Sequence, residues 1–407
     1  MFKKALLCAT VAALCASAAY AAPTEKHYSP GATDSEIRIG QTTPYSGPAS
    51  AYTVYGVVQL AYYKMLNEEH GGINGRKVTL LSLDDAYSPP KTFEQTRNLI
   101  EHEQVLAIIG SLGTPTGVAV RGYLNQKKVP QLLQLSNSSQ WNKPKQFPWS
   151  MSLNLAADQE ASALAKWLLS TKPDAKIGIV YENDDFGKDY VAGFQKGLGD
   201  KASMIVKTAG FELTDSNPDS QVLELKAAGA NVVVVAAANK FAALSIRKMA
   251  DMQWEPLKIL ATGGNAIGSV LKVAGLQNAI GAVSVSVYKD PLDPATLQDK
   301  DVRDFYAFMK KYCPTINAQD TNSVGAYVLA EVAAWILQHS GNDLTRENVM
   351  RSATHLDIKG LPMVAQGVTI SNSPENYLAF HELQLMRFDG TTWRSFARVP
   401  APPTPAH

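Results

Sequence analysis

The chain has 407 residues, 45% of them hydrophobic, with 38 Lys and Arg residues against 37 Asp and Glu residues. This near-neutral balance, without any run of Lys and Arg, argues against a nucleic acid partner and against electrostatic binding to a membrane surface. By length, the chain is expected to form about two to three domains that each bury a hydrophobic core.

The N-terminal segment has the pattern of a secretory signal peptide. Two lysines precede an apolar run from Ala5 to Ala16, and an A-x-A site around Tyr20 follows. The run is shorter than the roughly 20 apolar residues that cross a bilayer. We therefore expect residues 1–21 to be a signal peptide, with cleavage after Ala21 or Ala22 and a periplasmic mature protein. An uncleaved anchor is the alternative.

Removal of this segment leaves 36 basic and 37 acidic side chains and one cysteine, Cys313. Since the mature chain has no second cysteine, its fold is expected to be stable without an internal disulfide. No later apolar segment reaches membrane-spanning length.

Short runs of Val, Ile and Leu alternate along the chain with longer segments of helical period. This alternation is typical of parallel sheets covered by helices on both faces. Between the first two runs, apolar residues from Val54 to Leu66 have the spacing of a helix with one buried stripe, and the turn from Gly71 to Arg76 ends it. The predicted strands are Ile37–Gln41, Val78–Leu83, Val105–Gly110, Pro130–Leu135, Ile177–Tyr181, Asn231–Ala236, Ile259–Thr262 and Ala282–Val287.

The alternation of strands and helices begins again near Lys176, after an aromatic and proline-rich stretch from Pro144 to Ser150. This restart predicts a second lobe, although one long sheet is the alternative. Residues 399–407, which are rich in proline, are expected to be a loose tail.

Two neighbouring predicted strands end in loops that are rich in hydrogen-bond donors. In the loop Ser111–Gly117, Gly113 allows close approach of the backbone and Thr114 supplies a hydroxyl. The loop Ser136–Trp141 is a second cluster of hydroxyls. Each loop alone is more commonly a helix cap, but ligands bind at the carboxyl ends of parallel strands. The two together therefore indicate a site that holds a carboxylate with neutral donors.

The first loop, from Thr42 to Gly56, brings Ser46, Tyr52 and Tyr55 to the same edge of the sheet. Aromatic residues there are suited to the wall of a pocket. For Tyr55, simple packing under the loop is an equally good interpretation.

Signatures of common enzyme classes are absent from the sequence. The segments HEQVL and HELQL lack the second His of a zinc protease, and there is no nucleophile elbow, Walker A loop or C-x-x-C pair. The acidic segment Tyr181–Gly187 could hold a metal, although a solvated loop is the simpler interpretation. We predict no enzymatic activity, no cofactor and no metal site.

In six segments the chain resembles the type I periplasmic binding proteins of ABC transporters, specifically the leucine/isoleucine/valine-binding family. They are, in order, IRIGQTTPYSGPAS, GGINGRKV with LSLDDAYSPPK, AIIGSLGTPT, VPQLL, IGIVYENDDFGKDY and ATGG. The resemblance implies an α/β fold of two Rossmann-like lobes with parallel sheets, joined by three hinge crossovers. Lobe I is expected at residues 34–150 and 287–360, and lobe II at 151–286 and 361–398.

The resemblance also implies roles for individual residues. Thr114 falls where the family contacts the carboxylate of its ligand, Ser138 and Ser139 fall in the second contact loop, and Tyr52 matches the aromatic residue of the first loop. The implied mechanism is closure of the lobes around a small ligand, which a monomer then presents to the permease of an importer.

Three positions depart from the family pattern. Phe186 replaces a Tyr, Ala238 and Asn239 occupy the place of another Tyr, and Gly263 replaces the acidic residue that neutralises an ammonium group. Because an unpaired buried ammonium is costly, we expect an aromatic or aliphatic acid as ligand. Branched-chain amino acids are the alternative ligand class, a sensor subunit is the alternative role, and an exported enzyme is a third interpretation.

Overall fold

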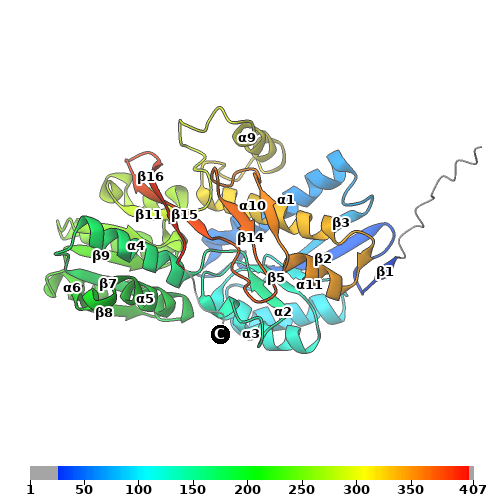
Figure 1. The fold of residues 1–407 in the computed structure, drawn as a ribbon, viewed down its shortest axis with the longest axis horizontal. Coiled ribbons are helices and arrows are strands. Elements are labelled where there is room, and N and C mark those ends of the chain that lie inside the picture. Colours follow the sequence, from blue (N-terminus) through cyan, green and yellow to red (C-terminus); the bar gives the residue numbers. More distant parts are fainter. Residues whose placement is uncertain (1–25, 403–407) are drawn as a thin grey trace, which may run out of the picture.

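The computed structural model describes residues 26–402 and has two α/β lobes that lie side by side (Figure 1). The predicted signal peptide at residues 1–21 and the last part of the predicted tail, residues 403–407, lie outside the described residues.

Lobe I contains a parallel sheet with the strand order β3-β2-β4-β5-β6. On one face α1 packs against α10, and on the other α2 packs against α3. The strands are β2 (Glu36–Thr43), β3 (Lys77–Asp84), β4 (Ile108–Ile109), β5 (Gln131–Gln134) and β6 (Ser150–Ser152). The helices are α1 (Thr53–His70), α2 (Pro89–Glu101), α3 (Thr114–Gln126), α9 (Lys300–Tyr312), α10 (Thr321–His339) and α11 (Arg346–Ala353).

Lobe II repeats this arrangement in the order β8-β7-β9-β10-β11 and adds β15 and β16 as antiparallel strands at one edge. The strands are β7 (Ile177–Glu182), β8 (Ile205–Phe211), β9 (Val232–Ala236), β10 (Leu257–Leu260), β11 (Val283–Ser286), β15 (Glu382–Phe388) and β16 (Trp393–Pro400). The helices are α4 (Ala157–Thr171), α5 (Asp185–Leu198), α6 (Asp219–Ala227), α7 (Asn239–Asp251) and α8 (Lys272–Ala274).

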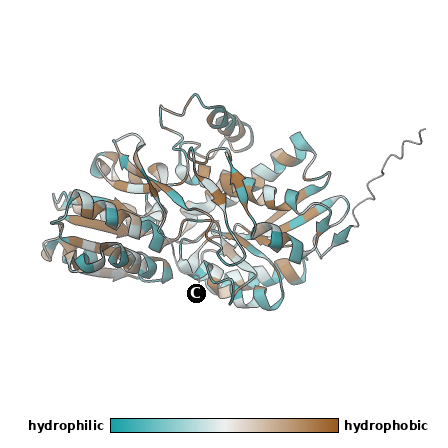
Figure 2. Cartoon of the chain, in the orientation of Figure 1, coloured by the Kyte–Doolittle hydropathy of each residue, from teal (hydrophilic) through white to brown (hydrophobic). Residues whose placement is uncertain are grey.

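The hydrophobic runs of the sequence form the buried centres of both sheets. All five residues of β9 are buried, which is expected of a central parallel strand that has helices on both faces. Figure 2 shows hydrophobic strands beneath helices whose outer surfaces are hydrophilic. Each of the eight predicted strands overlaps an observed one, and the helix predicted around Val54–Leu66 is α1, which ends at Gly71 in the left-handed conformation (φ 68°).

The chain passes between the lobes three times, after β6, after β11 and before β15, so the predicted two-lobed α/β fold with three crossovers is confirmed. Before the third passage, β13 (Asp357–Lys359) pairs with β14 (Thr369–Ser371) in an antiparallel two-stranded sheet. A further two-stranded sheet joins β1 (His27–Tyr28) to β12 (Asp343–Leu344).

The predicted loose tail requires a correction at its start. Val399 and Pro400 belong to β16, where they pair with Leu383 and Glu382 of β15, and Gln159 donates a hydrogen bond to the Pro402 carbonyl at 2.8 Å. Pro400 is tolerated because β16 is an edge strand, where a missing N–H breaks no central ladder.

Candidate functional site

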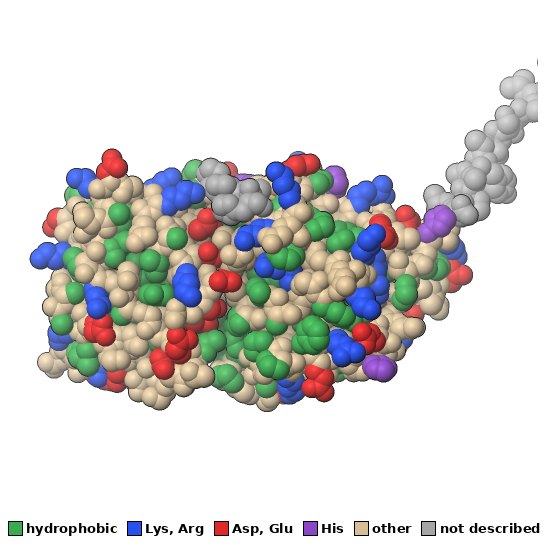
Figure 3. Space-filling view, turned by 90° about the horizontal axis from the view of Figure 1, so that it is seen from below, with side chains coloured by type: hydrophobic (Ala, Val, Ile, Leu, Met, Phe, Trp, Pro, Cys, Tyr) green, Lys and Arg blue, Asp and Glu red, His purple; other side chains and the backbone are tan. Residues whose placement is uncertain are grey.

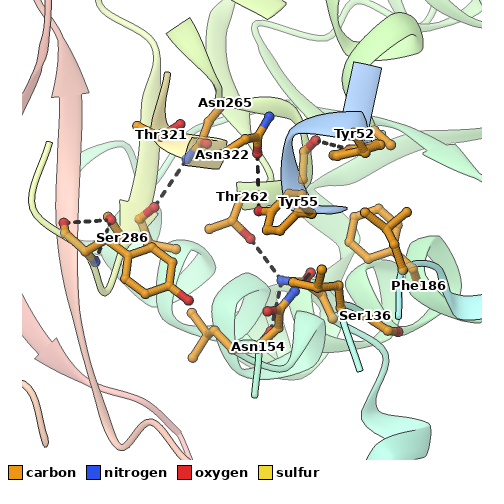
Figure 4. Close-up of a pocket in the computed structure, with 18 of the residues that line it drawn as sticks. Tyr52, Tyr55, Ser136, Asn154, Phe186, Thr262, Asn265, Ser286, Thr321 and Asn322 are labelled. Atoms are coloured by element: carbon orange, nitrogen blue, oxygen red, sulfur yellow. Dashed lines mark hydrogen bonds between the residues drawn. The ribbon is translucent and has the colours of Figure 1, made fainter. Parts of the chain in front are cut away.

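A cavity of about 160 Å³ lies between the two lobes, at the carboxyl ends of their parallel strands. Cavities of roughly 150 Å³ are large enough for a benzene ring. In Figure 4, the labelled side chains Tyr52, Tyr55 and Phe186 from the two lobes surround the same space. The two lobes therefore line one cavity that has room for a small molecule.

The lobe I side of this cavity is formed by neutral hydrogen-bonding groups. Gly113 has a φ of 110°, and a Cβ atom there would lie 2.4 Å from the Thr116 hydroxyl, so only glycine fits without rearrangement. Thr114 begins α3, is buried, and its Oγ1 lies 2.7 Å from Oγ of Ser136. This arrangement offers two hydroxyls at a helix N-terminus, a favourable place for an anion.

The predicted residues Ser138 and Ser139 do not line the cavity. Instead, Oγ of Ser138 and the backbone N–H of Ser139 both donate hydrogen bonds of 2.7 Å to the Asp189 carboxylate of α5 in lobe II. The loop therefore binds a carboxylate that belongs to the protein itself. The lining positions of this loop are Ser136 and Asn137.

Direct hydrogen bonds join the lobes around the cavity. The Tyr52 hydroxyl donates to the Gly263 carbonyl at 2.9 Å and accepts a longer bond, 3.4 Å, from the Asn239 N–H. Asn137 Nδ2 donates to Thr262 Oγ1 at 3.0 Å. Burial raises the pKa of the Tyr52 phenol above its usual value, so this group remains a neutral donor.

The other predicted site residues divide into two groups. Phe186 and Gly263 line the cavity, and a Cβ atom at Gly263 would meet only the Phe186 ring, at 3.7 Å. Ser46 lies outside the lining and donates to Asp84 at 2.7 Å. Asn239 is buried outside the lining, next to Ala238, which does line the cavity.

Two acidic side chains of lobe II line the cavity although they were not predicted as site residues. Glu182 ends β7, and Asp184 caps the N-terminus of α5 by accepting from the Gly187 N–H at 3.0 Å. Burial raises the pKa of both carboxyl groups, and the charge of Asp184 raises that of Glu182 further. The sequence shows that both residues lie in an acidic run at the end of a strand, but it does not show that their side chains point into the cavity.

Residues from late in the chain complete the lining, among them Tyr288, Asn322, Met386 and Trp393. No local motif predicts them as site residues, because the chain brings them to the cavity only after it has crossed between the lobes. Among the described residues that line the cavity, none is Lys, Arg or His. An anion bound there must therefore be held by neutral donors.

Further observations bear on other classes of function. Within residues 26–402, no group of three or more His, Cys, Asp or Glu side chains is placed to hold a metal ion. No helix in this part of the chain is long and apolar enough to cross a membrane. On the face seen in Figure 3, acidic side chains gather along the junction of the lobes and basic ones are scattered, so this face has no continuous basic surface.

Comparison with known proteins gives consistent matches over most of the chain. Residues 36–392 match the family described as periplasmic binding protein. Leu/Ile/Val-binding protein homolog 7 of Brucella abortus (strain 2308) is 24% identical over 349 residues, which cover 81% of this chain and 82% of that protein.

Two solved structures with bound ligands share the fold. A branched chain amino acid ABC transporter protein from Thermus thermophilus with bound valine has a TM-score of 0.78 and 16% identity, covering 90% of this chain and 97% of that one. A solute binding protein of an ABC transporter from R. palustris, in complex with 4-hydroxybenzoate, has a TM-score of 0.76 and 18% identity, covering 90% and 98%.

Proposed function

The chain belongs to the periplasmic binding proteins of ABC transporters, in the type I branch of the leucine/isoleucine/valine-binding proteins, and on this basis we propose that it binds a small carboxylate for import. The observation that carries the proposal is the cavity between the lobes, whose lobe I side includes Gly113 and Thr114 at the start of α3 and Ser136 after β5. The protein performs no chemistry on its ligand in this proposal.

The carboxylate lies at the N-terminus of α3. Oγ1 of Thr114 and Oγ of Ser136 bond to each other at 2.7 Å, and either atom can be the donor. A carboxylate that arrives between them can accept a hydrogen bond from each hydroxyl, because each proton rotates freely about its C–O bond. The positive end of the helix dipole compensates in part for the absence of a cationic side chain.

Ligand exchange requires the lobes to separate. The hydrogen bonds from Tyr52 to Gly263 and from Asn137 to Thr262 join the lobes beside the cavity, and in this proposal they break when a ligand enters or leaves. We propose a hinge motion at the three crossovers, with a monomer that presents the closed form to the permease outside the cytoplasmic membrane.

The body of the ligand is the less constrained part of the proposal. Gly263 leaves no acid at the family's ammonium position, which favours an uncharged aromatic or aliphatic body against the walls of Tyr52, Tyr55 and Phe186. A specific observation supports the amino-acid alternative: the carboxyl groups of Glu182 and Asp184 line the same cavity.

A thermal-shift screen tests the proposed function. The probes are benzoate, 3-phenylpropionate, 4-methylpentanoate, phenylalanine, leucine and valine, each beside its methyl ester. A ligand at about 100 times its dissociation constant should stabilise the protein by about 2.7 kcal/mol. We expect at least one free carboxylate to do so and its ester to have no effect. Equal stabilisation by acid and ester would refute carboxylate recognition.

A further inference from the structure

Glu182 occupies a special position in lobe II. It ends β7, which lies beside β9 in the sheet. The next strand after β7, β8, lies on the far side of β7, and the next strand after β9, β10, lies on the far side of β9. In doubly wound sheets, the crevice at such a switch point is where ligands bind. The carboxyl group accepts a hydrogen bond from the Ala238 N–H, which follows β9. Glu182 thus belongs to the lobe II wall of the cavity, whose lobe I wall includes Gly113 and Thr114 at the start of α3.

One oxygen of this carboxyl group has no protein partner. Glu182 is only 2% exposed, and its Oε2 makes no hydrogen bond with any residue in the range 26–402. Asn239, the first residue of α7, is 4% exposed, and neither atom of its side-chain amide has a partner among the same residues. Buried polar atoms in native proteins are nearly always hydrogen-bonded. Two neighbouring strand ends in lobe II therefore leave polar groups unpaired beside the cavity.

No residue in the range 26–402 donates a hydrogen bond to Oε2 of Glu182. Asp184 is a second acid, and the phenols of Tyr52 and Tyr87 are the other titratable groups close enough to feel its charge. The Tyr52 hydroxyl is already donated to the Gly263 carbonyl. Because the described lining contains no Lys, Arg or His, no cationic side chain there supplies the missing donor, and a molecule inside the cavity can supply it.

We propose that Glu182 accepts a hydrogen bond from a donor group on the ligand, so that the protein selects carboxylates that carry a hydroxyl or an ammonium as a second polar group. This inference rests on the proposed function, since it assumes that the carboxylate occupies the Thr114 side. The ligand then lies across the cleft, with its acceptor end in lobe I and its donor end in lobe II. An acid with a wholly apolar body leaves Glu182 unpaired and binds more weakly.

Matched ligand pairs test this selection by isothermal titration calorimetry. Benzoate against 4-hydroxybenzoate isolates the hydroxyl, and 3-phenylpropionate against phenylalanine isolates the ammonium. In the unmodified protein, we expect one of the two added donors to strengthen binding by about ten- to a hundredfold. Glu182→Leu should abolish that gain and leave the affinity of the apolar partner within about threefold.

Glu182→Gln identifies the donor. An amide can both donate to and accept from a hydroxyl, so a gain from a hydroxyl should survive in this variant. An ammonium only donates, and it loses its counter-ion, so a gain from an ammonium should disappear. Either pattern supports the proposal. If neither donor strengthens binding to the unmodified protein, or if a gain persists in Glu182→Leu, the proposal is overturned.

Glu331 of α10 provides the matched control. It is another buried carboxyl group, burial raises its pKa to about 8, and its Oε2 also has no partner among the described residues, but it does not line the cavity. Glu331→Leu should leave both ligand gains unchanged.

Methyl esters distinguish a failure of the proposed function from a failure of the role of Glu182. Esters that bind as tightly as acids refute the proposed function, whereas ester-sensitive binding without a donor gain refutes only the role of Glu182.

Discussion

Asp189 is expected to control closure of the two lobes. Its carboxylate accepts hydrogen bonds from Ser138 Oγ and the Ser139 N–H, both at 2.7 Å and both across the lobe junction. Asp189→Ala leaves these two donors without their partner in the closed form only, because water satisfies them when the lobes separate. At about 1 kcal/mol for each lost bond, closure should weaken by about 2 kcal/mol. Under the proposed mechanism ligand binding requires closure, so affinity should fall by about thirtyfold.

We expect hydrogen bonding, and not the ionised charge of Asp189, to stabilise the junction. Burial raises the pKa of this carboxyl group, which means that ionisation favours the open form, where the group is hydrated. Asp189→Asn retains an acceptor oxygen without this desolvation cost, so its affinity should stay within about threefold of the unmodified protein. The contrast between alanine and asparagine separates hydrogen bonding from charge.

Calorimetry with the tightest carboxylate and solution scattering with and without ligand measure these effects. Asp189→Ala should bind more weakly and need more ligand to reach the compact radius of gyration. Asp200→Ala, a substitution of an exposed acid in the same lobe, is the control and should change neither quantity. If Asp189→Ala binds as tightly as the unmodified protein, the contact with Ser138 and Ser139 does not contribute to closure and the reasoning fails.

Three other predictions concern the cavity and the group beneath it. Thr114→Val should weaken carboxylate binding by about ten- to a hundredfold in calorimetry, since one charge-assisted hydrogen bond is lost; undiminished affinity would remove Thr114 from the site. Gly263→Glu should be tolerated, because a Cβ atom at this position meets only the Phe186 ring. It should strengthen the binding of phenylalanine relative to that of 3-phenylpropionate, and an unchanged ratio of the two affinities would contradict this. Burial raises the pKa of Glu160 to about 7, so the unfolded chain releases this proton at lower pH than the folded one, and the contribution of Glu160 to stability falls as pH rises from about 4.5 to 7. Urea unfolding at pH 4.5 and at pH 7 measures the free energy of unfolding, and its decrease between the two pH values should be smaller in Glu160→Gln than in the unmodified protein. Equal decreases in the two proteins would show that Glu160 does not cause the pH dependence.

Much of the fold could be predicted because its determinants are local. The runs that became β2 and β9 are bounded by turn residues and rich in β-branched side chains, and such runs form buried parallel strands in most contexts. The edge strands β8 and β16 were missed, because their sequences, IVKTAGF and WRSFARVP, do not alternate regularly between apolar and polar residues.

The site could be predicted where a residue follows directly from its strand. Gly113 and Thr114 come at the end of the β4 segment, so the topology alone brings them to the binding edge of lobe I. Tyr52, Phe186 and Gly263 line the cavity for the same reason. Thus the sequence by itself determined the two-lobed fold, the family and the edge of the sheets at which the cavity lies.

Only the tertiary structure decided which polar groups face the cavity and which face each other. Ser138 and Ser139 have the composition of a ligand loop, but packing of α5 against this loop brings Asp189 to them first. Glu182 lies in an acidic run that suggests a solvated loop, yet its strand is central and its side chain is buried in the cavity wall. Side-chain direction and partner depend on contacts between segments 50 or more residues apart, and a local pattern carries no information about such contacts.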